Sequence, residues 1–231
     1  MNKNEKLQSH KLFLDRDILD KWNNNRYEIY TSPNKAIGVV ILGEAHQRQQ
    51  REQMDFIEAV KPTYLLHESQ GGWIYDPKSK RFTKPRGRLF DNVGDNVNVA
   101  TVTTRRFQEQ SSRLGFKIIG CDLTNAEILE VGKKLCILFP QQYRYVEGQN
   151  SIRRIDDNYR LLSFEELAKD KNIMFYRDKH MVKTITKYEA LSGKPIVAIM
   201  GGSHGNNIHE AILRKKKFGY AYVKQYAGKL S

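Results

Sequence analysis

The chain has 231 residues, of which 39% are hydrophobic and 10% are aromatic. That content is sufficient for a packed core and argues against intrinsic disorder. The longest apolar runs, residues 37–42 and 196–200, are far shorter than the roughly 20 residues that a membrane helix requires. Two cysteines without C-x-x-C spacing, Cys121 and Cys136, indicate neither a disulfide framework nor a structural zinc site. Because residues 1–11 are polar and lack a secretory apolar stretch, we expect a cytoplasmic protein without membrane contact.

The formal net charge of +13 favours anionic partners. Basic residues are concentrated between residues 78 and 88, with a second cluster at 214–217. This charge leaves an anionic substrate, a nucleic acid or another polyanion open as a partner, although no nucleic-acid-binding motif is present. A lysine-rich solvated surface explains the same charge equally well.

The first part of the chain alternates helices and strands. Spaced apolar residues predict a helix within residues 12–22, and residues 27–30 are expected to form an edge strand. Residues 37–42 are a continuous β-branched run, which is typical of a strand buried on both faces. A helix with regularly spaced apolar residues follows and ends before Pro62, and residues 63–67 form a second short apolar strand.

Residues 70–98 break this alternation. Glycines and prolines interrupt a basic segment without periodicity, which we expect to be an insertion or a lid. After it the alternation resumes. The patterns predict a helix at 101–114, a strand at 116–120, a helical stretch with breaks at 125–167, a long helix at 175–191, a strand at 196–200, a helix at 208–217 and a final strand at 220–226.

Strands that alternate with helices predict one α/β domain over residues 1–231, with a mostly parallel central sheet flanked by helices. In such sheets ligands bind beyond the carboxyl ends of the strands. Each of the four apolar strands is followed by polar residues that suit catalysis, and parallel pairing would bring them to one edge. These residues are Glu44 with His46, Glu68, Asp122 and His204.

Two of these strand ends share a Gly-x-x-His motif, GEAH at residues 43–46 and GGSH at residues 201–204. Glycine permits a tight turn after a strand, and imidazole exchanges a proton near neutral pH or ligates a metal. A carboxylate such as Glu68 beside imidazoles can act as a base, ligate a metal or orient a histidine. Histidines packed at turns and a salt bridge of Glu68 are the structural alternatives.

The second motif also fits G-x-S-x-G, in which Ser203 would be a nucleophile. A hydrolase of that type supplies its acid and its histidine after the serine, but residues 205–231 offer only Glu210 and His209. The serine mechanism is therefore disfavoured. Asn207 is expected to cap the following helix, whose positive end would face the site.

The long helix carries a charged pair, Arg177-Asp178, in line with the apolar residues of one face. Arg177 would clamp an anionic group or stabilise transition-state charge, and a structural ion pair is the alternative. His180 points with Lys183 and Lys187, so we expect it on the surface.

With these motifs the chain resembles the superfamily that groups the Tiki proteases, TraB/PrgY proteins, ChaN-like haem-binding proteins and erythromycin esterases. The resemblance rests on the two Gly-x-x-His motifs, on Glu68 and on the charged pair of the long helix, and it spans residues 37–226. It implies a site in which His46, Glu68 and His204 hold a divalent metal (Mn, Co or Zn) or activate water directly, and it leaves haem binding open. The basic insertion and the absence of membrane segments depart from the family pattern.

The leading hypothesis is a hydrolase of an ester or amide bond. His46 is the expected general base, Glu68 orients it or shares a metal with His204, and Arg177 stabilises developing negative charge. The alternatives are a metal- or haem-binding protein without turnover and a basic protein that binds nucleic acid or another polyanion. Four further residues are expected to contact the substrate or to support the site: Glu44, Asp122, Asp178 and Ser203.

Overall fold

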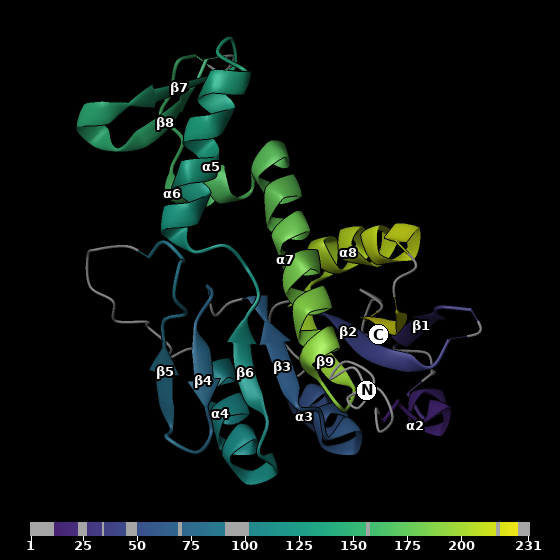
Figure 1. The fold of residues 1–231 in the computed structure, drawn as a ribbon. Coiled ribbons are helices and arrows are strands. Elements are labelled where there is room, and N and C mark those ends of the chain that lie inside the picture. The colour runs from purple at the N-terminus through teal and green to yellow at the C-terminus, as the bar shows by residue number, and fades with distance from the viewer. Residues whose placement is uncertain are drawn as a thin grey trace, which may run out of the picture.

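The computed structural model describes residues 12–22, 27–33, 35–44, 50–68, 71–90, 102–155, 158–215 and 218–225. A sheet of eight strands lies at its centre, with helices against both faces (Figure 1). The strands of this sheet are β1 (Tyr27–Thr31), β2 (Ile37–Glu44), β3 (Tyr64–His67), β4 (Ile74–Asp76), β5 (Arg81–Thr83), β6 (Lys117–Gly120), β9 (Ile196–Gly201) and β10 (Gly219–Gln225). The helices are α2 (Arg16–Asp20), α3 (Gln50–Val60), α4 (Val102–Leu114), α5 (Asn125–Leu138), α6 (Phe164–Ala168), α7 (Lys171–Leu191) and α8 (Gly202–Lys215).

Parallel pairing connects the strands that carry the predicted site. The order in the sheet is β1-β10-β2-β9-β3-β6-β4-β5, and each neighbouring pair from β10 to β6 is parallel. At one side of the sheet β1 pairs antiparallel with β10. At the other side β4 pairs antiparallel with β6 and with β5. The predicted α/β class with a mostly parallel sheet is therefore confirmed. The carboxyl ends of β2, β9, β3 and β6 lie along one edge, where such sheets bind ligands.

Alternation along the strands divides the core into two layers. Val40 and Leu65 belong to the layer that contains Phe56 of α3. Their chain neighbours Ile41 and Leu66 belong to the opposite layer, beside α7 and α8. All five side chains are at most 1% exposed. Because helices cover both faces, these strands are continuous apolar runs, which explains why the sequence pattern located them.

Part of the segment predicted to be an irregular insertion is a β-hairpin. β4 and β5 pair antiparallel, and β4 extends the sheet beyond β6. Tyr75 is buried, and its ring centroid lies 5.0 Å from that of Phe82. Strands of three residues are too short to show a period of two, so the pattern did not reveal them. Residues 70 and 91–98 of the predicted insertion lie outside the described residues.

The stretch predicted to be helical with breaks contains a second hairpin. Strands β7 (Tyr143–Val146) and β8 (Ser151–Arg154) form a separate sheet after α5, with a 3₁₀ turn η2 (Glu147–Gln149) between them. The helical prediction is wrong here because these two strands, YRYV and SIRR, mix charged with apolar residues and form no apolar run that would indicate a strand. Together with α5 and α6 they enclose their own hydrophobic cluster, and they project beyond the carboxyl edge of the large sheet (Figure 1).

α7 is the helix on which the candidate site depends. It spans 21 residues and begins earlier than predicted, because Asp170 caps it: the Asn172 N–H donates to Asp170 Oδ1 at 2.9 Å. Met181 and Ile185 of α7 pack against the sheet. Neither α7 nor any other helix in the described parts of the chain is long and apolar enough to cross a membrane.

Candidate functional site

The end of β9 contacts the end of β3 through Glu68. The Gly201 N–H of β9 donates a hydrogen bond to Glu68 Oε2 at 2.7 Å. β9 also pairs in register with β2, so that the backbone of Glu44 lies opposite Gly201. The predicted convergence of these strand ends is therefore present. The side chain of Glu44 and the whole of His46 lie outside the described residues.

The Gly-x-x-His motif after β9 leads directly into a helix. α8 begins at Gly202, so Ser203 and His204 lie in its first turn and not in a loop before a helix at 208–217. The prediction that Asn207 caps this helix is wrong, because Asn207 lies within it. Ser203 is exposed, whereas His204 is only 4% exposed. The motif thus directs its histidine inward and its serine outward.

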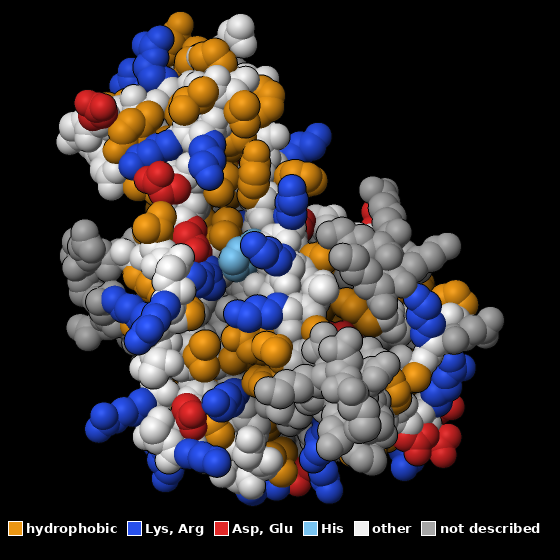
Figure 2. Space-filling view, in the orientation of Figure 1, with side chains coloured by type: hydrophobic (Ala, Val, Ile, Leu, Met, Phe, Trp, Pro, Cys, Tyr) orange, Lys and Arg blue, Asp and Glu red, His pale blue; other side chains and the backbone are white. Residues whose placement is uncertain are grey.

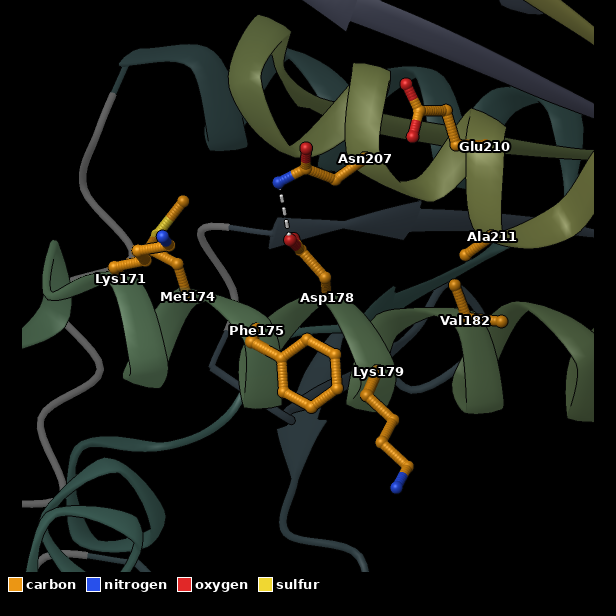
Figure 3. A pocket seen from close by; sticks show the side chains of 9 residues that line it. All are labelled: Lys171, Met174, Phe175, Asp178, Lys179, Val182, Asn207, Glu210 and Ala211. Atoms are coloured by element: carbon orange, nitrogen blue, oxygen red, sulfur yellow. Dashed lines mark hydrogen bonds between the residues drawn. The ribbon is translucent and has the colours of Figure 1, made fainter. Parts of the chain in front are cut away.

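A buried histidine–aspartate pair joins α8 to α7. His204 Nδ1 lies 2.5 Å from Asp178 Oδ1. Asn207 Nδ2 donates to Asp178 Oδ2 at 2.7 Å (Figure 3). An ionised carboxylate only accepts hydrogen bonds, so beside it Nδ1 of His204 is the donor, and in the neutral ring Nε2 then keeps the lone pair. The ring is thereby fixed, with Nε2 as the atom that could accept a proton or bind a metal.

Arg177 and Asp122 form a second pair, in which Asp122 is buried and Arg177 is largely buried. Arg177 Nε lies 3.1 Å from each carboxylate oxygen of Asp122, and Nη2 donates to Oδ2 as well. Nη1 donates to the Ala168 carbonyl at 3.0 Å. Burial opposes the charge, but the hydrogen bonds and charge of Asp122 raise the pKa of Arg177 above its ordinary value. The ion pair that the sequence left as an alternative is present, and a role of Arg177 toward substrate stays a prediction.

The described residues include two of the three predicted metal ligands. Glu68 Oε2 accepts from Gly201, and His204 has a carboxylate on its Nδ1 side, as metal-ligating histidines commonly do. Within the described residues no group of three His, Cys, Asp or Glu side chains could hold a metal ion. Because His46 lies outside them, the set of His46, Glu68 and His204 stays a prediction, as does haem binding.

A pocket of about 660 Å³ lies between α7 and α8 beside the histidine–aspartate pair. Asp178 and Asn207 lie on its wall, and Val182 and Ala211 face each other across it (Figure 3). A molecule in this pocket would contact the two groups that hold His204. Sequence reasoning missed the part played by Asn207, although a spacing of three residues from His204 places both on one helix face.

His180 is half-buried, whereas its helical spacing from Lys183 and Lys187 predicts a surface position. It faces a second pocket together with Arg88 and Lys183. Burial and the nearby charge of Arg88 lower the pKa of His180. The helical period correctly grouped His180 with Lys183, but it could not show that the chain around Arg88 approaches this face.

The fold and this cluster define a class of protein: an α/β protein with a buried histidine–aspartate pair at the carboxyl edge of its sheet. Comparison of the chain with family models, with curated proteins and with solved structures finds no significant match. The resemblance based on the two Gly-x-x-His motifs therefore stays a prediction.

Variants of Glu68 test whether its hydrogen bond with the Gly201 N–H or its charge stabilises the fold. Glu68→Gln retains an oxygen that can accept from the Gly201 N–H, whereas Glu68→Ala leaves that buried N–H without it. We expect the alanine variant to lose about 1–3 kcal/mol of unfolding free energy and the glutamine variant to lose clearly less. Urea denaturation of both variants measures this. Equal losses would show that the hydrogen bond does not stabilise the edge.

Proposed function

We propose that this protein hydrolyses an ester or amide bond, with His204 as the general base and Asp178 as the residue that positions it. The observation that supports this is the hydrogen-bonded series Asn207–Asp178–His204 at the carboxyl edge of the parallel sheet. The Gly-x-x-His motif at residues 43–46 predicts His46 as the base. Because the ring of His204 is oriented by the buried carboxylate of Asp178, we assign the base to His204 and leave His46 as a second imidazole of the site.

The proposed reaction uses the lone pair of His204 Nε2. A water molecule loses a proton to Nε2 as its oxygen bonds to the substrate carbonyl carbon. The imidazolium, stabilised by the Asp178 carboxylate, then returns the proton to the leaving alcohol or amine as the C–O or C–N bond breaks. α8 begins at Gly202, and the positive end of this 14-residue helix favours negative charge that develops on the carbonyl oxygen.

A divalent metal is compatible with the same residues. In that version Nε2 of His204 and the carboxylate of Glu68 would be ligands, with His46 as the third. The metal would supply an acidic bound water. Asp178 would then orient a ligand instead of a base, and Glu68 would still be held by the Gly201 N–H. A chelator separates the two versions, because hydrolysis by imidazole alone does not need a metal.

The proposal is tested with a panel of chromogenic esters and anilides, with and without chelator. Two variants of His204 are used: His204→Ala, and His204→Asn, whose amide can still donate toward Asp178. We expect both to lose roughly 10²–10⁴-fold in turnover, with the asparagine variant retaining the stability of the parent better. His46→Ala should lose activity to a similar extent. Equal turnover by the parent and the folded His204→Asn variant would overturn the proposal.

A further inference from the structure

A second pocket lies beside α7, at a part of the sheet that α7 and α8 do not cover. It has a volume of about 370 Å³, and Ile74 of β4, Ile119 of β6 and Tyr188 of α7 give it an apolar floor. Figure 2 shows this side of the molecule, where lysine and arginine side chains surround a hydrophobic area. Five of the lining residues are basic and, within the described part of the chain, none is acidic; the basic ones are Arg86, Arg88, His180, Lys183 and Lys187.

Arg88 is fixed at the wall of this pocket. Its Nε donates to Glu127 Oε1 and its Nη2 to the Asp122 carbonyl, both at 2.9 Å. Gly72 makes room for it, because a Cβ at that position would lie 2.3 Å from Arg88 Nη1. The carboxylate of Glu127 offsets the positive charge of Arg88, so Arg88 contributes mainly shape and hydrogen-bond donors.

Three of the other four basic residues supply the charge of the pocket, because burial lowers the pKa of His180 and disfavours its charged form. Arg86, Lys183 and Lys187 make no ion pair with another described residue. Lys183 and Lys187 are one helical turn apart, a spacing at which like charges repel each other. A concave apolar surface concentrates their field, because the low-dielectric wall screens it less than water does. An anion in the pocket would relieve this repulsion.

We propose that this pocket binds a small organic phosphate. The phosphate would lie among Arg86, Lys183 and Lys187, and the apolar part of the ligand would contact Ile74 and the ring of Tyr188. The volume falls at the lower end of the roughly 300–1,000 Å³ typical of small-molecule sites, which suits a phosphate monoester or a mononucleotide better than a nucleic-acid strand. The proposal concerns a different pocket from the His204 site and does not depend on the proposed hydrolysis.

The test is calorimetric titration of the full chain with adenosine 5′-monophosphate, inorganic phosphate and uncharged adenosine at low salt. We expect adenosine 5′-monophosphate to bind more tightly than phosphate, adenosine to bind at least tenfold more weakly than its monophosphate, and the affinity to fall as salt is added. The double variant Lys183→Gln, Lys187→Gln should weaken binding of the monophosphate by roughly tenfold or more. Both lysines are exposed at the pocket rim, so the variant should keep its fold.

The matched control is Lys171→Gln, Lys179→Gln. It removes the same charge from the same helix, but these lysines line the other pocket, next to α8. We expect it to leave the affinity within about twofold of the parent. Equal weakening in both double variants would overturn the proposal, since it would mean that only net charge matters. So would the absence of binding below about 10 mM monophosphate, or tight binding of a polynucleotide without binding of the mononucleotide.

Discussion

Replacing Asp178 by asparagine is expected to lower the turnover number by roughly 10³–10⁴-fold while leaving KM nearly unchanged. The asparagine amide can present its NH₂ group to His204, which would place the lone pair on Nδ1 and the proton on Nε2. Nε2 could then no longer accept a proton from water. Because the side chain keeps its size and Asn207 remains nearby, the change alters the tautomer more than the packing. Steady-state kinetics on the best substrate of the ester and anilide panel measures the effect.

Glu210→Gln is the matched control for this variant. Glu210 is an exposed carboxylate on the wall of the same pocket, on α8, and it extends away from Asp178 (Figure 3). The same loss of one negative charge should leave the turnover number within about threefold of the parent. If Asp178→Asn also retains turnover in that range, Asp178 does not position a catalytic histidine. Comparable losses in both variants would point instead to the net charge of the pocket.

The parallel core of the fold was predictable because a strand that is buried on both faces is a continuous run of apolar residues. β2 and β9 are runs of apolar residues between polar segments, and their parallel pairing follows from the intervening helices. The strand-end positions of Glu68, Asp122 and His204 followed from the same rule. The hairpins β4–β5 and β7–β8 did not. The equally short strands β3 and β6 lie in apolar runs, whereas the hairpin strands mix polar with apolar residues and are too brief to show a period.

The partners within the site were not predictable from spacing. Asp178 and His204 are 26 residues apart and meet only because α7 and α8 pack against each other on one face of the sheet. The start of α8 was not predicted, because a segment with three glycines is typical of a loop. These glycines are Gly201, Gly202 and Gly205. At Gly205 the glycine has a packing reason: a Cβ there would lie 3.0 Å from Tyr222. A close contact with a distant strand, and not a turn, explains that residue.

The second large effect is expected on stability, from Arg177→Met. The substitution removes the guanidinium from Asp122, whose side chain is only 7% exposed, and leaves a buried carboxylate with the Leu123 N–H as its remaining donor. Breaking a buried ion pair in this way costs about 3–5 kcal/mol. Arg113→Met is the control, since it breaks a comparable bidentate pair with Glu58 in which both side chains are about half exposed. That loss should be clearly smaller, because solvent screens an exposed ion pair.

Urea denaturation of the two variants separates the structural role of Arg177 from a catalytic one. If Arg177→Met costs no more than Arg113→Met, the pair with Asp122 does not stabilise the fold, and the hydrogen bonds from Arg177 to Asp122 and to the Ala168 carbonyl need another explanation. Adding Asp122→Leu to Arg177→Met should recover part of the lost unfolding free energy, because it removes the unpaired charge. If the double variant is stable but hydrolyses the panel substrates far more slowly than the parent, then the guanidinium acts on the reaction, as the sequence predicts. Full activity would assign Arg177 to the fold alone.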